Sequence, residues 1–190
     1  MRSTVFYQYD DEQHEKKAQE VLAGLGEFVV AFERVCAEMR SCIFCIFRRE
    51  GLNNQGLVQV SINKAAAEGL RATLGGVFSE LKDQNEADKQ QVKELLKRID
   101  KLGSTRNELL HAEWFLNYDY ENAGDEFTAL ALKSNTSQNQ GAYGIKVPVT
   151  KDSLSSHVRE ATEILVLLRR LAICMNQKGF IVNEMLSKPL

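Results

Sequence analysis

The hydrophobic positions of the chain recur mainly with the spacing of amphipathic helices. Between about residue 10 and Gly51, apolar residues return every three or four positions, at Val21, Leu22, Leu25, Phe28, Phe32, Val35, Met39, Ile43 and Ile46. This spacing places the side chains on one stripe of a helix, and glycine is common just beyond a helix end. The pattern therefore predicts one long first helix, with Gly24 and Gly26 as the expected place for a bend.

The middle of the chain predicts two more helices. Residues 53–59 have the composition of a loop, and a helix over residues 61–81 follows, interrupted at Gly75-Gly76, where the small residues indicate a close helix crossing. A third helix is expected over residues 86–102 and ends at Gly103. One of its faces carries a run of lysines at Lys89, Lys93, Lys97 and Lys101. Such a run is typical of a solvated face, and a track for RNA is the alternative.

The last third of the chain combines helix and strand patterns. Thr105 and Glu108 fit a capping box, which predicts a fourth helix from Thr105 to about Leu116. Residues 127–133 and 142–149 indicate a β-hairpin, and residues 150–153 offer caps for a final helix that runs to about residue 176. The predicted fold is therefore all-α, a bundle of about five helices with a small β-hairpin before the last helix.

Composition and charge narrow the class of protein. The chain has 190 residues, 44% of them hydrophobic and 26% charged, which is the composition of a globular protein with a real core. Its length favours one domain over residues 1–190. A formal net charge of −2 argues against a broad basic face for duplex DNA or anionic membrane, so any contact with nucleic acid must be local.

The N-terminal segment and the cysteines indicate a cytoplasmic protein. The first residues lack the pattern of a secretion signal, and no run of 18 apolar residues occurs, so no membrane anchor is expected. The four cysteines lie within apolar helical patterns, where reduced and buried thiols are expected: Cys36, Cys42, Cys45 and Cys174. Cys42 and Cys45 form a CxxC pattern, but a redox pair or half of a zinc site is the weaker interpretation because no second pair follows. We expect no metal and no cofactor.

The histidines point to one candidate site. His14 and His157 have no companions that suggest chemistry and are expected at the surface, whereas His111 is four residues from Asn107 and shares a helix face with it. Arg106 is about 140° from His111 on a regular helix, so its side chain must wrap around the first turn to meet the histidine.

If the helix begins at Thr105, its free N–H groups and Arg106 form a trap for phosphate, and Glu108 caps the backbone and points away from the anion. His111, one turn further along, is then placed to move a proton at a ribose hydroxyl. The alternative interpretation is structural: Arg106 forms a salt bridge, Asn107 caps a turn and His111 packs under Trp114. From spacing alone, the structural interpretation is the simpler one.

The motif Arg106-Asn107-x-x-x-His111, followed by Ala112 and Trp114, resembles the signature of the HEPN superfamily of helical ribonucleases and nucleotide-binding domains. The resemblance implies metal-independent endoribonuclease activity on single-stranded or loop RNA. The RNA 2′-hydroxyl attacks the adjacent phosphate and leaves a 2′,3′-cyclic phosphate. His111 would be the acid/base, Arg106 would stabilise the phosphorane, and Asn107 would orient the histidine or bind phosphate.

The resemblance also implies partners and leaves an alternative open. Related domains usually form homodimers with two motifs in one cleft, and many are toxins, phage-defence effectors or stress-response nucleases that an antitoxin or regulatory protein restrains. Toxins silenced by nucleotidyl modification carry a tyrosine two residues after the histidine, whereas Glu113 stands there in this chain. Some members of the superfamily bind without cleaving, so a non-catalytic helical module for RNA, nucleotide or protein is the alternative function.

Overall fold

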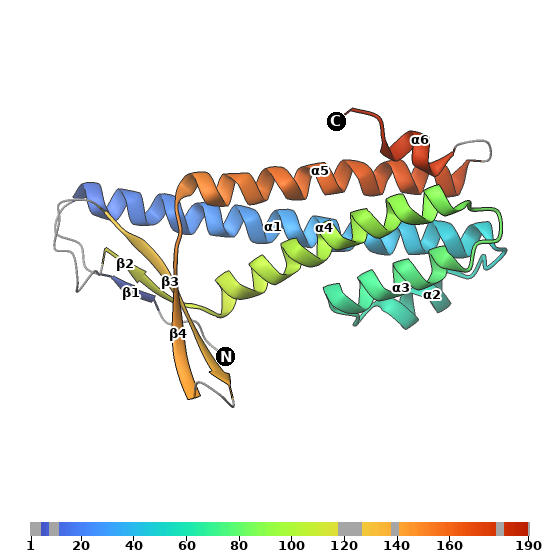
Figure 1. The fold of residues 1–190 in the computed structure, drawn as a ribbon. Helices are drawn as coiled ribbons and strands as arrows, with labels where there is room; N and C mark the ends of the chain where they lie inside the picture. Colours follow the sequence, from blue (N-terminus) through green and yellow to red (C-terminus); the bar gives the residue numbers. More distant parts are fainter. Residues whose placement is uncertain (1–4, 8–11, 118–126, 138–140, 178–180, 190) are drawn as a thin grey trace. The chain divides into compact units, whose positions relative to one another are not determined.

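The computed structural model describes residues 5–7, 12–117, 127–137, 141–177 and 181–189. The described residues form six helices, α1 (Glu12–Arg49), α2 (Gln55–Ile62), α3 (Ala67–Ser79), α4 (Glu86–His111), α5 (Lys151–Asn176) and α6 (Val182–Leu186). They also form four strands, β1 (Val5–Tyr7), β2 (Glu113–Leu116), β3 (Ala129–Ser137) and β4 (Gly141–Pro148) (Figure 1). The predicted fold class, a mainly helical protein with a small β-structure before the last long helix, is confirmed.

Contacts group the chain into two compact units. Unit 1 comprises Met1–Val30 and Ser104–Val158, and unit 2 comprises Ala31–Gly103 and Arg159–Leu190. The three long helices, α1, α4 and α5, each contribute one segment to each unit. One domain over the whole chain stays a prediction, and each unit is described by itself below.

Unit 1 is built around the sheet, in the order β1-β2-β3-β4. The hairpin of β3 and β4 is the predicted one, and β2 pairs antiparallel with β3, with Trp114 opposite Ala131. On its other side β2 pairs parallel with β1, with Trp114 opposite Val5. In strand β2, Trp114 and Leu116 are buried, whereas Glu113 is exposed and Phe115 is half-buried, as expected for a strand with one face on a core. The buried members, Trp114 and Leu116, anchor the core of this unit.

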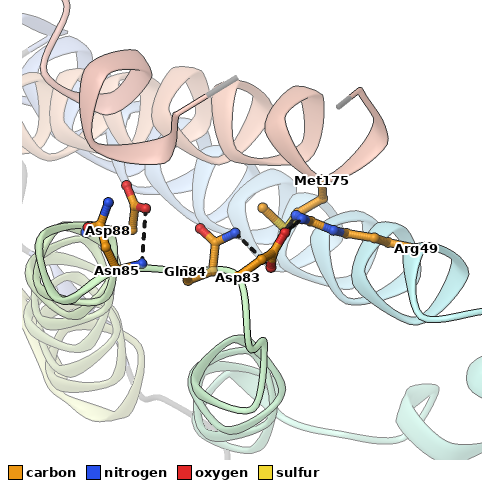
Figure 2. A network of polar contacts seen from close by, with 6 residues as sticks. All are labelled: Arg49, Asp83, Gln84, Asn85, Asp88 and Met175. Atoms are coloured by element: carbon orange, nitrogen blue, oxygen red, sulfur yellow. Dashed lines mark hydrogen bonds and ion pairs between the residues drawn. The ribbon is translucent and has the colours of Figure 1, made fainter. Parts of the chain in front are cut away.

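The helices of unit 2 are held by a large apolar core and by polar links at their ends. The core residues from α1 include Phe32, Val35, Met39, Cys42, Ile43 and Ile46. The buried carboxylate of Asp88 accepts the backbone N–H of Asn183 at 2.6 Å and so ties α4 to the first turn of α6. Asp88 and Asn85 also exchange side-chain to backbone hydrogen bonds at the start of α4, and Arg49 pairs with Asp83 just before it (Figure 2). These contacts fix the first turn of the helix that carries the candidate motif.

The helix predicted over residues 61–81 is wrong in its boundaries. Two helices, α2 and α3, stand there, and the break lies at residues 63–66. Helix α2 begins inside the segment predicted as a loop because the side chain of Asn54 accepts the Leu57 N–H and caps it. Gly75 does not interrupt α3: a Cβ added there would lie 3.0 Å from Leu96 of α4, so the glycine permits the predicted close crossing.

The predicted boundary between a third and a fourth helix is also wrong. Helix α4 runs without a break from Glu86 to His111, and residues 113–116, predicted as the end of a helix, form β2. Strands β1 and β2 and helix α6 were not predicted. The last long helix, α5, was predicted. Thr150 and Ser153 exchange side-chain to backbone hydrogen bonds of 3.0 and 3.1 Å at its start, as in a capping box.

Candidate functional site

The position of the motif follows from the continuity of α4 through Gly103. The buried apolar residues of α4 are Val92, Leu95, Ile99, Leu102 and Leu109. The first four are spaced by three or four and Leu109 follows after seven, two helical turns, so the stripe continues past the glycine. A Cβ added to Gly103 would lie 3.4 Å from the ring of Phe32, which is ordinary van der Waals contact. A single glycine weakens a helix interior by about 1 kcal/mol, which burial of the stripe on both sides can offset. Helix α4 therefore carries the motif in its last two turns.

Trp114 fixes the point at which α4 ends. The last four carbonyls of a helix lack partners within the helix, and the indole Nε1 of Trp114 donates to one of them, the Leu109 oxygen, at 2.9 Å. Both Trp114 and the intervening Ala112 are buried. The chain consequently turns from α4 into β2 directly after His111 (Figure 1).

The structure brings two of the three motif residues into direct contact. Arg106 is half-buried, and its Nη1 donates to Oδ1 of the exposed Asn107 at 3.1 Å. His111 is exposed and follows Asn107 by one helical turn on the same face. Within the described part of the chain, no hydrogen bond joins His111 to Arg106 or Asn107. The structural interpretation in which His111 packs under Trp114 is wrong because the imidazole faces solvent.

The phosphate trap at a helix start is wrong. Arg106 and His111 lie near the C-terminal end of a 26-residue helix, so the free backbone groups nearby are carbonyls. The end of a helix carries partial negative charge, which favours a cation and disfavours an anion. Any attraction for phosphate at this site must therefore come from the Arg106 guanidinium and the Asn107 amide. The exposed carboxylates of Glu108 and Glu113 lie beside them in the sequence and oppose it.

Glu108 does not cap the backbone, because no helix begins at Thr105. It lines a cavity in unit 1 together with Thr105, Leu109 and Ala112. At 100° per residue these four positions cover an arc of about 100° around the helix, and Asn107 lies about 150° from its centre. The cavity and the Arg106-Asn107-His111 site therefore use different faces of the same two turns.

The other histidines are half-buried, not fully at the surface as predicted. The Nδ1 of His14 lies 3.3 Å from the Nδ2 of Asn117. The His157 ring packs against the ring of Phe28, with 5.3 Å between the ring centroids. The run of lysines on α4 is partly paired, since Lys89 contacts Glu86 and Lys97 contacts Glu94. The paired lysines fit the solvated-face interpretation better than a track for RNA.

Three of the four cysteines are buried, as predicted, and Cys45 is half-buried. The Cys42 thiol donates to the Leu168 carbonyl at 3.2 Å, and burial raises its pKa far above the ordinary range. A raised pKa disfavours the reactive thiolate, which fits the core interpretation of the CxxC pattern. Among the described residues, no group of three His, Cys, Asp or Glu side chains is placed to hold a metal ion. In the same part of the chain, no helix has the length and apolar character needed to cross a membrane.

Comparisons of the chain with protein-family models, with curated proteins and with solved structures gave no match. The geometry at the end of α4 and the motif are therefore the two features that bear on the function of this chain. Sequence reasoning found the three motif residues but missed their position in the helix. The available signal was the apolar stripe from Val92 to Leu109. It keeps to one helical face across Gly103 and so favours one continuous helix over a new helix with its N-cap at Thr105.

Proposed function

We propose that this protein is a metal-independent endoribonuclease of the HEPN type that cuts single-stranded or loop RNA. The observation that carries the proposal is the exposed His111, one helical turn beyond the hydrogen-bonded pair of Arg106 and Asn107. An exposed histidine next to a partly buried arginine is open to an external substrate, whereas a histidine of purely structural role is usually packed against its neighbours.

The proposed chemistry transfers the phosphate within the RNA chain. A histidine accepts the proton of the ribose 2′-hydroxyl, the oxygen forms a bond to phosphorus, and the bond to the departing 5′-oxygen breaks as that oxygen gains a proton. The products are a 2′,3′-cyclic phosphate and a 5′-hydroxyl. Arg106 neutralises the charge that develops on the phosphorane oxygens, and Asn107 holds the guanidinium in place through its 3.1 Å hydrogen bond.

We further propose that two copies of the chain share one cleft. Arg106 lies about 140° from His111 around the helix, so the arginine of one copy and the histidine of the other are better placed to meet at one phosphate than the pair within one copy. A two-fold axis beside the end of α4 brings a second histidine and a second arginine to the same phosphate, because both copies present the same surface. A protein partner that covers this surface would restrain the enzyme, as an antitoxin does.

The test is cleavage of mixed cellular RNA in EDTA, with analysis of the fragment ends. Wild type is expected to leave cyclic phosphates, and His111→Ala is expected to lower the rate by about 10²-fold or more, the usual contribution of a general acid or base. His14→Ala is the matched control, because it removes a histidine outside the motif, and it should cleave as wild type does. Equal cleavage by wild type and His111→Ala would exclude His111 as the catalytic group.

The shared cleft makes a separate prediction. Arg106→Ala and His111→Ala should each be inactive alone, whereas a mixture in which subunits exchange should regain part of the activity. The mixed dimer retains one arginine and one histidine in the cleft. A mixture as inactive as its components, after exchange has been verified by differently tagged chains, would contradict the shared cleft.

A non-catalytic binding module is the second candidate, and the acidic surroundings favour it. Glu108 and Glu113 are both exposed and flank His111 at the negative end of a helix, an arrangement that weakens the attraction for RNA phosphates. In such a module, His111→Ala changes the affinity for a partner and no RNA is cut by either protein. The cleavage assay above distinguishes the two functions.

A further inference from the structure

A cavity of about 180 Å³ lies in unit 1 beside the last two turns of α4. Its floor is apolar, formed by the buried side chains of Leu109, Ala112, Ala131 and Val149. Helix α4, the strands β3 and β4 and the first turns of α5 all contribute to its walls. Ligand sites in proteins typically have this form, an apolar concave surface with a few convergent polar groups.

The volume limits the ligand to a small molecule. An apolar cavity of about 150 Å³ in a protein is large enough to hold benzene, whereas sites for drug-sized molecules begin at about 300 Å³. The cavity of about 180 Å³ thus accommodates a single six-membered ring with a short side chain. A nucleotide is too large to be enclosed.

The polar groups of the lining select the charge of the ligand. Among the described residues of the lining, four are polar: Thr105, Glu108, Ser153 and His157. Glu108 is the one acidic residue of these, and none of the described lining residues is lysine or arginine. Glu108 is exposed, whereas the floor residues are buried and apolar. A carboxylate at the edge of an apolar cavity complements a cation attached to an apolar body.

From this combination we infer that the cavity binds a small amine, with its ring on the apolar floor and its ammonium group at Glu108. The site is independent of the proposed nuclease, because Asn107 lies on the opposite side of α4 and Arg106 and His111 lie outside the arc that lines the cavity. Amine binding and RNA cleavage can therefore be tested independently of each other.

The test is an NMR titration of the full chain, labelled with ¹⁵N, with three molecules of nearly equal size at constant ionic strength. Phenethylamine carries a cation, 2-phenylethanol is neutral and phenylacetate carries an anion. Phenethylamine should shift the amide signals around Leu109, Ala112 and Ala131 and saturate them at a concentration about tenfold lower than 2-phenylethanol, a ratio that corresponds to about 1.4 kcal/mol. Phenylacetate should bind most weakly.

Two charge variants and one volume variant complete the test. Glu108→Gln should remove the preference for the amine over the alcohol, whereas Glu113→Gln, which removes an exposed carboxylate outside the lining, should keep it. Ala112→Leu, in a protein whose ¹⁵N spectrum shows that it is folded, should weaken all three ligands by filling the cavity. Equal binding of amine and alcohol by wild type would overturn the inference. The inference would also be overturned if Glu108→Gln and Glu113→Gln lost the preference for the amine equally. Amide signals that shift only at residues away from the cavity would overturn it too.

Discussion

Replacing Gly103 by alanine tests the feature that places the candidate site, the continuity of α4. If the helix passes through Gly103, alanine should stabilise the protein, because alanine is the better helix former by about 1 kcal/mol. The added Cβ meets the Phe32 ring at 3.4 Å, an ordinary contact that requires no movement of the ring. The expected gain is therefore about 0.5–1 kcal/mol in the free energy of unfolding.

Gly51 is the matched control, because its backbone is in the left-handed region. It follows α1 with φ of 93°, a conformation that costs an alanine about 1–2 kcal/mol. The two substitutions are chemically identical and should change stability in opposite directions. For a chain of this size 1 kcal/mol corresponds to about 2–4 °C in Tm, so thermal unfolding followed by circular dichroism resolves both effects.

A loss of stability in Gly103→Ala would show that α4 is not continuous through this position. If the glycine ended one helix before a new one began at Thr105, it would occupy the position beyond the helix end that glycine fills in a left-handed conformation. Gly103→Ala would then lower Tm about as much as Gly51→Ala does. In that case Arg106 would lie at a helix start, and the phosphate trap would again be the better description of the site.

Three further predictions concern polar contacts and RNA binding. Asp88→Ala should lower the free energy of unfolding in urea by about 2 kcal/mol, because its carboxylate accepts the Asn183 N–H and hydrogen bonds to charged groups contribute about 1.5–3 kcal/mol. Asp88→Asn, which keeps an oxygen acceptor but removes the charge, should lose less, and a loss equal to that of Asp88→Ala would contradict a contribution from the neutral acceptor. Arg98 donates to Glu160 at 2.7 Å and lowers the pKa of that carboxyl, so the pair stabilises the folded state above the ordinary glutamate pKa. The Glu160 side chain is more than a third exposed, so solvent screens the ion pair. Glu160→Gln should therefore lower the free energy of unfolding by no more than about 1 kcal/mol at pH 7. The cost should vanish as the pH falls below about 4.3 through the lowered pKa, and urea unfolding at pH 7 and pH 3 measures it. RNA bound at two or three phosphates should give a slope of about −1.4 to −2.1 in a plot of log affinity against log salt, and a slope near −5 would indicate a broad basic face that the net charge argues against.

The features that the sequence determined are those in which local signals and burial agree. Helix α1 follows its apolar stripe and ends before Gly51, and α5 begins at the capping box of Thr150 and Ser153. The hairpin of β3 and β4 was also predicted, because its strands are neighbours in the chain and need no distant partner. In each case, a few residues contain the information that decides the element.

The tertiary structure decided the features in which a local signal competes with burial. Thr105 and Glu108 have the pattern of a capping box, which is worth about 1 kcal/mol, but the stripe that includes Leu102 and Leu109 buries several apolar side chains worth about 1.5–3 kcal/mol each. Strands β1 and β2 are too short to form alone, and β2 depends on β1, more than 100 residues earlier, as well as on β3, which follows it. The motif residues were therefore visible in the sequence, whereas their position at the end of α4, rather than at its start, was set by long-range packing.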